Sequence, residues 1–73
     1  MGMKRRQILS TIAREAQRQG RHWQHQRDGA NHEIWRCGSI GVPIPRHTEI
    51  GSRMAEMIFK ELEAELGKDW WRR

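Results

Sequence analysis

The chain has 73 residues, of which 36% are hydrophobic and 32% are charged. A chain of this length buries only about 60% of the surface that its unfolded form exposes, which excludes a two-domain enzyme with an interdomain cleft. Fourteen Lys and Arg residues against nine Asp and Glu give a net charge of +5, and eleven of the fourteen cations are arginine. Because arginine presents a planar fork of donors that matches phosphate, this composition favours a nucleic acid over an anionic membrane as the partner.

The sequence contains no segment typical of export or of membrane insertion. No apolar run approaches about 18 residues, and no charged segment followed by an apolar one opens the chain. Cys37 is the single cysteine, so neither an internal disulfide nor a cysteine-based zinc site is available. We therefore expect a cytoplasmic protein without metal, cofactor or membrane partner. Because Met1-Gly2 resembles a cloning remnant, the expected domain covers residues 3–73.

The first expected element is a helix over residues 4–19. Its apolar positions have the spacing of one helical stripe, and Gly20 follows where a helix commonly ends in the left-handed conformation. The positions of the stripe are Ile8, Leu9, Ile12, Ala13 and Ala16.

The middle of the chain changes to the alternating period of β-strands. The expected strands cover residues 21–27, 31–37 and 40–45, with turns at Asp28-Gly29 and Gly38-Ser39. Two details of these strands follow from residue type. Trp35 and Cys37 are expected to face inward because Arg36 does not suit a core. Pro43 and Pro45 lack an amide hydrogen, which makes the third strand short or places it at a sheet edge.

Residues 46–49 are expected to connect to a second helix over residues 50–66, whose apolar stripe contains Met54, Ile58, Leu62 and Leu66. The order helix, three strands, helix predicts an α+β fold, in which two helices cover one face of an antiparallel sheet as a two-layer sandwich. The other sheet face is then free to meet a ligand. The Trp70-Trp71 pair either closes the open end of the core or stacks on bases, and we favour packing.

Histidine is the residue type most suited to acid–base chemistry at neutral pH. His32 begins the second expected strand, where it is positioned to deprotonate an RNA 2′-OH, although an ordinary surface histidine is the more common explanation. His22 and His25 are separated by an odd number of positions, so a strand would point them to opposite faces and they make a poor metal pair. His47 follows Arg46 on a loop, where it either binds phosphate or caps the next helix.

Cations occur at both ends of the chain and between its elements, as phosphate neutralisation requires. For most of them a solvated surface is the simpler explanation. They include Lys4, Arg5, Arg6, Arg27, Arg36, Arg46, Arg53, Arg72 and Arg73.

Four segments carry a resemblance to the HicA family of bacterial toxins over about residues 3–67. They are Lys4-Arg5-Arg6 before a helix, Gly29-Ala30-Asn31-His32 at the second strand, Val42-Pro43-Ile44-Pro45-Arg46-His47 at the third strand, and a closing helix. The sequence departs from many members at Ala30-Asn31, where they have Ser and a second His. The short turn at Gly38-Ser39 and the tryptophan tail are also departures.

The resemblance implies a fold like that of double-stranded-RNA-binding domains and a metal-independent endoribonuclease that cuts mRNA. It implies His32 as the catalytic general base and a HicB-like antitoxin as the inhibiting partner. The expected RNA-binding residues are Lys4, Arg5, Arg6, Arg27, Gly29, Asn31, Arg36, Arg46 and His47. A non-catalytic RNA-binding module of the same fold is the alternative, and a protein that only docks an acidic partner is a third possibility.

Overall fold

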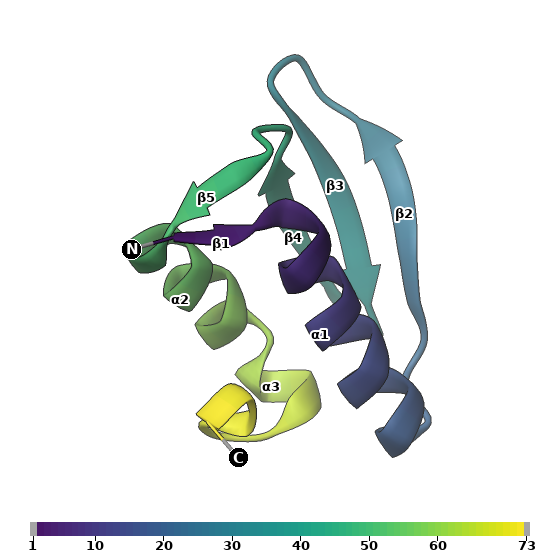
Figure 1. Ribbon diagram of the computed structural model, residues 1–73. Helices are drawn as coiled ribbons and strands as arrows, with labels where there is room; N and C mark the ends of the chain where they lie inside the picture. The colour runs from purple at the N-terminus through teal and green to yellow at the C-terminus, as the bar shows by residue number, and fades with distance from the viewer. Residues whose placement is uncertain (1, 73) are drawn as a thin grey trace.

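The computed structural model describes residues 2–72, so Met1 and Arg73 lie outside the described part of the chain. A helix precedes a three-stranded antiparallel sheet, and a second helical region follows it (Figure 1). Within residues 2–72, no helix is both long and apolar enough to cross a bilayer. The elements are β1 (Gly2–Lys4), α1 (Arg5–Gln19), β2 (Trp23–Asp28), β3 (His32–Cys37), β4 (Ile40–Pro45), β5 (Glu49–Gly51), α2 (Ser52–Glu61), α3 (Glu63–Leu66) and the 3-10 turn η1 (Trp70–Arg72).

Helix α1 forms where the apolar stripe predicts it. Ile8, Ile12 and Ala16 are buried on one face of the helix, toward the core. At the helix start, the Lys4 backbone N–H donates to the side-chain oxygen of Gln7 at 3.1 Å. At the other end Gly20 has φ +71°, the left-handed conformation that ends many helices. The first predicted helix is therefore confirmed, with its start at Arg5 rather than Lys4.

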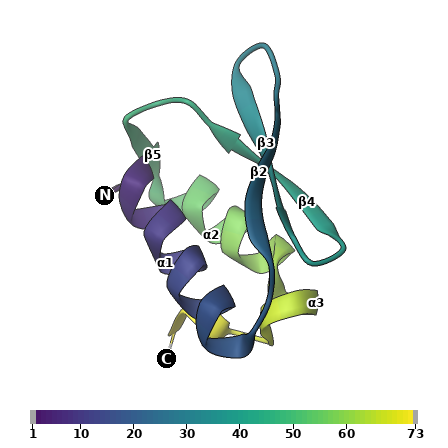
Figure 2. The ribbon, with the colours of Figure 1, turned by 90° about the vertical axis from the view of Figure 1, so that its right-hand side faces the viewer.

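The sheet has the strand order β2-β3-β4, and α1 and α2 lie on the same side of it (Figure 2). Cys37, Val42 and Ile44 are buried beneath the helices, and Trp35 packs against this core while stacking on Trp23 at 5.1 Å. The inward orientation predicted for Trp35 and Cys37 is confirmed. Because side chains alternate along a strand, the remaining positions of β3 face away from the helices. Those positions are His32, Ile34 and Arg36.

The two prolines of β4 lie on an edge strand, as predicted from their missing amide hydrogens. Pro43 is in register with Ile34, and Pro45 is in register with His32. The strand ends at Pro45, as predicted. The second proline of β4 therefore neighbours the first residue of β3, which brings the start of the following connector close to His32.

A second, two-stranded sheet, which the residue pattern did not predict, pairs the start of the chain with the segment before α2. β1 pairs antiparallel with β5, with Met3 opposite Ile50. The predicted helix start at Ile50 is wrong, because Ile50 is buried in β5 and α2 begins at Ser52. Gly2, which we expected to precede the domain, belongs to β1. A Cβ atom on Gly2 would lie 2.7 Å from the backbone oxygen of Ile50. Strands of three residues have too little local pattern to predict their partners.

The second helical region is divided rather than continuous. α2 ends at Glu61, and α3 follows after Leu62. The predicted burial of Met54 is wrong, since its side chain is 44% exposed and that of Met57 is 52% exposed. The buried stripe of this region is centred closer to Phe59 than predicted, so Met54 lies outside it. Its members are Ala55, Ile58, Phe59, Leu62 and Leu66.

The aromatic tail closes the core, as we favoured from the sequence. Trp70 is 3% exposed, and its Nε1–H donates to the Phe59 carbonyl oxygen at 2.8 Å. Trp71 stacks on the Phe59 ring with the centroids 5.9 Å apart. A buried indole needs such an acceptor, because an unpaired N–H in the core would be costly.

Replacing Gly38 by alanine should destabilise the fold. Gly38 has φ +58°, and a Cβ atom there would lie 2.1 Å from Oε1 of Glu65, whose carboxylate accepts a hydrogen bond from Ser39. We expect the left-handed strain to cost about 1–2 kcal/mol and to lower the Tm by roughly 5–15 °C. Thermal unfolding followed by circular dichroism measures this change.

Gly41→Ala is the matched control, because its Cβ atom would meet no heavy atom closer than 3.7 Å. An equal loss of Tm in both variants would contradict the special role of Gly38.

Candidate functional site

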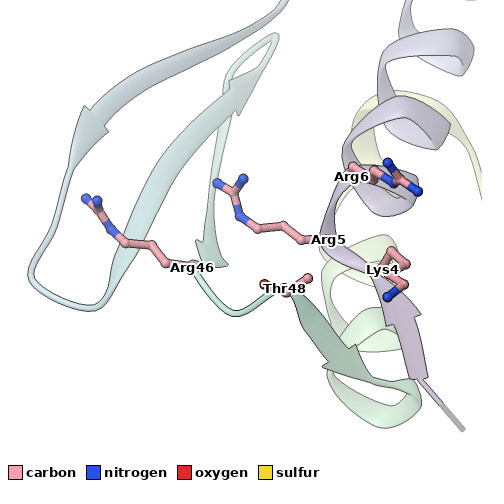
Figure 3. A pocket seen from close by; sticks show the side chains of 5 residues that line it. All are labelled: Lys4, Arg5, Arg6, Arg46 and Thr48. Carbon is pink, nitrogen blue, oxygen red and sulfur yellow. The ribbon is translucent and has the colours of Figure 1, made fainter.

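A basic pocket of about 480 Å³ lies where the start of α1 meets the connector after β4. In Figure 3, the Arg46 side chain points toward the β2–β3 turn, and that of Arg5 extends from α1 toward the sheet. Four of the five lining side chains are cationic, so the pocket favours an anion. The cationic ones are Lys4, Arg5, Arg6 and Arg46, and the fifth is Thr48.

Arg5 positions the two walls of this pocket. Its backbone N–H donates to the Thr48 carbonyl oxygen at 2.8 Å, and its Nε–H donates to the Pro45 carbonyl oxygen at 2.8 Å. Lys4, the residue before Arg5, lies opposite Glu49 in the β1–β5 pairing. The first residues of α1 are thereby held beside a connector about 40 positions later in the chain, and the pocket forms between them.

Carboxylates accompany three of the four pocket cations. Lys4 Nζ lies 3.6 Å from Glu49 Oε2. Arg5 forms an ion pair with Glu33, and Arg46 Nη2 lies 3.3 Å from Asp28 Oδ1. Arg6 is exposed and has no ion pair among the residues that the structure describes. The pocket therefore combines one unpaired cation with three that share their charge with a neighbour.

Glu33 is the most strongly held of these carboxylates. Trp35 Nε1–H donates to Glu33 Oε1 at 2.9 Å, and the Arg5 guanidinium pairs with the same oxygen. The indole hydrogen bond and the positive charge of Arg5 lower the pKa of Glu33 against the opposing effect of desolvation. Glu33 is consequently ionised at neutral pH and keeps Arg5 turned toward the sheet.

The β2–β3 turn separates the Arg46 guanidinium from the His32 imidazole. Arg46 Nη2 donates to the Gly29 carbonyl oxygen at 3.1 Å, and the Gly29 N–H donates to the His32 carbonyl oxygen at 2.7 Å. The imidazole lies against Gly29, since a Cβ atom there would be 3.3 Å from His32 Nε2. No residue in the range 2–72 forms a hydrogen bond with this imidazole. Its nitrogens are thus available to a substrate.

A β-bulge brings His25 and Asp28 to the same face, although their spacing of three would separate them in a regular strand. The register of β2 shifts between His25 and Arg27, which adds one residue. His25 Nε2 and Asp28 Oδ1 are 2.8 Å apart. We missed this pair because nothing in the residue types of β2 marks a bulge at Gln26.

One group of side chains has a composition suited to a metal ion. His25, Asp28 and Glu33 each place a ligand atom within 4.8 Å of the others. However, Arg46 pairs with Asp28 and Arg5 pairs with Glu33. A divalent cation would have to approach two guanidinium groups, so we describe this group as an ion-pair network.

The structure separates the other predicted binding residues from the pocket. Arg27 and Arg36 belong to the sheet face that points away from the helices, where Arg36 donates to Gln26 and to the Ser39 carbonyl oxygen. Asn31 is exposed in the β2–β3 turn, and His47 is exposed next to Arg46. The predicted RNA-binding cations therefore form two groups. Lys4, Arg5, Arg6 and Arg46 gather around the pocket, whereas Arg27 and Arg36 lie on the outer face of the sheet. Thr48 and Asp28 belong with the pocket group but were missed, since neither carries a positive charge.

Comparisons with family models, with curated proteins and with solved structures found no match to this chain.

Glu33→Gln should change how stability depends on pH. Because the folded pKa of Glu33 lies below its ordinary value of 4.5, the ionised carboxylate stabilises the fold above that value, and this contribution is lost as the pH falls through the folded pKa. We expect the variant to be less stable at neutral pH by about 1 kcal/mol, with the difference from the parent shrinking in acid. Thermal unfolding at a series of pH values measures both effects.

Glu61→Gln provides the control, because Glu61 is exposed and has no ion pair among the described residues. A stability difference between parent and Glu33→Gln that stays constant through the acid range would contradict this role of Glu33.

Proposed function

We propose that this protein is an endoribonuclease of the HicA type, which holds single-stranded RNA by its phosphates at the basic pocket and cleaves it with His32 as general base. The observation that carries the proposal is the placement of Gly29, whose carbonyl oxygen accepts a hydrogen bond from Arg46 and which lies against the imidazole of His32. The order of helix, three antiparallel strands and helix supports the finer assignment to a fold like that of double-stranded-RNA-binding domains.

The proposed chemistry is an internal transfer that uses the RNA itself as nucleophile. His32 removes the proton of a 2′-OH, and the 2′-oxygen attacks the adjacent phosphorus. The bond from phosphorus to the 5′-oxygen breaks, leaving a 2′,3′-cyclic phosphate and a 5′-OH after the leaving oxygen takes a proton from water or from His47. Arg46 offsets the negative charge that develops on the phosphoryl oxygens.

A non-catalytic RNA-binding module remains the second candidate, and one observation favours it. The alternation of β3 places His32 on the sheet face away from the helices, whereas Arg5 turns toward Glu33 on the helix side. A phosphate deep in the pocket is therefore across the turn from the imidazole. Binding alone requires only the cations of the pocket.

An acidic inhibitor of the HicB type belongs to the same proposal. A small ribonuclease that cuts cellular mRNA has to be held inactive, and the net charge of +5 favours fast association with an acidic protein. The simplest mode of inhibition is to cover His32 together with the pocket cations.

Incubation of the purified protein with single-stranded RNA in excess EDTA separates the candidate functions. Cleavage under these conditions supports the metal-independent nuclease. A mobility shift without cleavage supports the binding module, and the absence of both supports a protein that only docks a partner. Cleavage that is lost with chelator and restored by a divalent metal would contradict the mechanism.

His32→Ala should abolish cleavage and leave the fold intact. The imidazole forms no hydrogen bond with residues 2–72, so we expect the Tm to move by only a few degrees. The readout is the rate at which a labelled single-stranded RNA is cut, with circular dichroism as the check on folding.

His22→Ala is the matched control, because His22 is exposed and its ring nitrogen forms a hydrogen bond with Gln24, two residues away. Cleavage by His32→Ala at the parent rate would refute the role of His32.

Arg46→Ala should weaken RNA binding and reduce its salt dependence. Each cation that contacts a phosphate releases a counterion, so losing one contact flattens the plot of log affinity against log salt by roughly one unit. Fluorescence anisotropy with labelled RNA at several salt concentrations measures the slope.

Arg72→Ala, at the opposite end of the chain, removes an exposed arginine that pairs with Glu56. Equal losses of affinity in the two variants would assign Arg46 to the general solvated surface.

A further inference from the structure

Asp28 makes a contact that the proposed RNA binding has to break or share. Its Oδ1 atom lies 3.3 Å from Arg46 Nη2 and 2.8 Å from His25 Nε2. Arg46 lines the basic pocket, whereas Asp28 is the last residue of β2 and is not among the lining residues. A carboxylate and a phosphate oxygen use the same donors of a guanidinium group, so the two compete for Arg46.

The contact is weak enough for a substrate to replace. The side chains of Asp28 and Arg46 are 65% and 44% exposed, and ion pairs at such positions contribute little to stability. Within residues 2–72, both polar contacts of the Arg46 guanidinium use Nη2: one is with Asp28, and the other is the hydrogen bond to the Gly29 carbonyl oxygen. Nε and Nη1 are consequently open to a first phosphate contact, and exchange of Nη2 follows.

Asp28 also loses less than Glu33 when its cation leaves. The interaction with His25 Nε2 remains after Arg46 turns to a phosphate. Glu33, in contrast, is held by the indole of Trp35 and by Arg5, whose backbone joins the walls of the pocket. Of the two carboxylates that pair with pocket arginines, Asp28 is therefore the one whose arginine is more readily given up.

We propose that Asp28 is an internal competitor that lowers the affinity of the pocket for RNA by occupying Arg46 in the free protein. This inference rests on the proposed RNA-binding function and adds a regulating residue to it. RNA binding exchanges the Asp28–Arg46 contact for a phosphate–Arg46 contact. The same exchange releases the Gly29 carbonyl from Arg46, so occupation of the pocket loosens the turn against which the His32 imidazole lies.

The proposed competition and a simpler positioning role for Asp28 predict opposite changes in RNA affinity when the charge of Asp28 is removed. If Asp28 merely positioned Arg46 for RNA, removing its charge would weaken binding. As a competitor, Asp28 opposes binding, and Asp28→Asn should tighten it about two- to fivefold at low salt. Asparagine preserves the size of the side chain and still accepts hydrogen bonds from Arg46 and His25. The gain should disappear at high salt, where exposed charges are screened.

Asp69→Asn is the matched control for the change in net charge. Asp69 also lies near an arginine, with Oδ1 4.0 Å from Arg72 Nη1, but it precedes η1 at the far end of the molecule from the β2–β3 turn (Figure 1). Its φ of +54° is tolerated by asparagine. The probe is a fluorescein-labelled, 2′-O-methylated single-stranded RNA, which cannot undergo attack by a 2′-OH, and the readout is fluorescence anisotropy.

The Arg46→Ala background tests whether the gain acts through Arg46. Asp28→Asn should tighten binding in the parent but not in Arg46→Ala, whereas a general charge effect would persist in both. Equal affinities of Asp28→Asn and Asp69→Asn, or weaker binding by Asp28→Asn, would overturn the inference while RNA binding by the parent still supported the proposed function. A parent and variants that all fail to bind RNA would refute the proposed function itself, and the inference with it.

Discussion

The attachment of Arg5 to the sheet is the contact on which the candidate site depends. Its backbone bonds to Thr48, its Nε–H bonds to Pro45, and its guanidinium pairs with Glu33. The first turn of α1 is thus fixed to β3, to the end of β4 and to the connector that follows. Lys4 and Arg6 share a pocket with Arg46 because these contacts hold the start of the helix there. The site is a product of tertiary packing and not of one local motif.

The four cations of the pocket repel one another, which destabilises the folded state, and the neighbouring carboxylates offset this repulsion. They come from β5, β3 and the end of β2, and each lies beside one cation. This arrangement favours a folded free protein and also limits how strongly the pocket attracts an anion. Stability and anion affinity are therefore opposed in this pocket.

The main elements were predictable because they have strong local signals. The apolar stripe of α1, the glycines at its end and at the β3–β4 turn, and the prolines of β4 each act within a few residues. The β1–β5 pairing and the bulge at Gln26 were not predictable, since both depend on contacts between distant segments. The four pocket cations were expected from their charge alone. Their grouping into one pocket, and the separate position of Arg27 and Arg36, became visible only in the folded structure, for the same reason.

The face on which His32 lies constrains the form of RNA that the proposed reaction can use. A general base must come within hydrogen-bond distance of the 2′-OH that it deprotonates. Arg46 donates to the Gly29 carbonyl oxygen and the His32 imidazole lies near Gly29, but the alternation of β3 places His32 on the sheet face away from the helices. One strand would have to pass over the β2–β3 turn to meet both. A single strand can bend between successive phosphates to follow that path, whereas an A-form duplex fixes its phosphates and pairs its strands. The geometry therefore favours single-stranded RNA as the substrate of the proposed reaction.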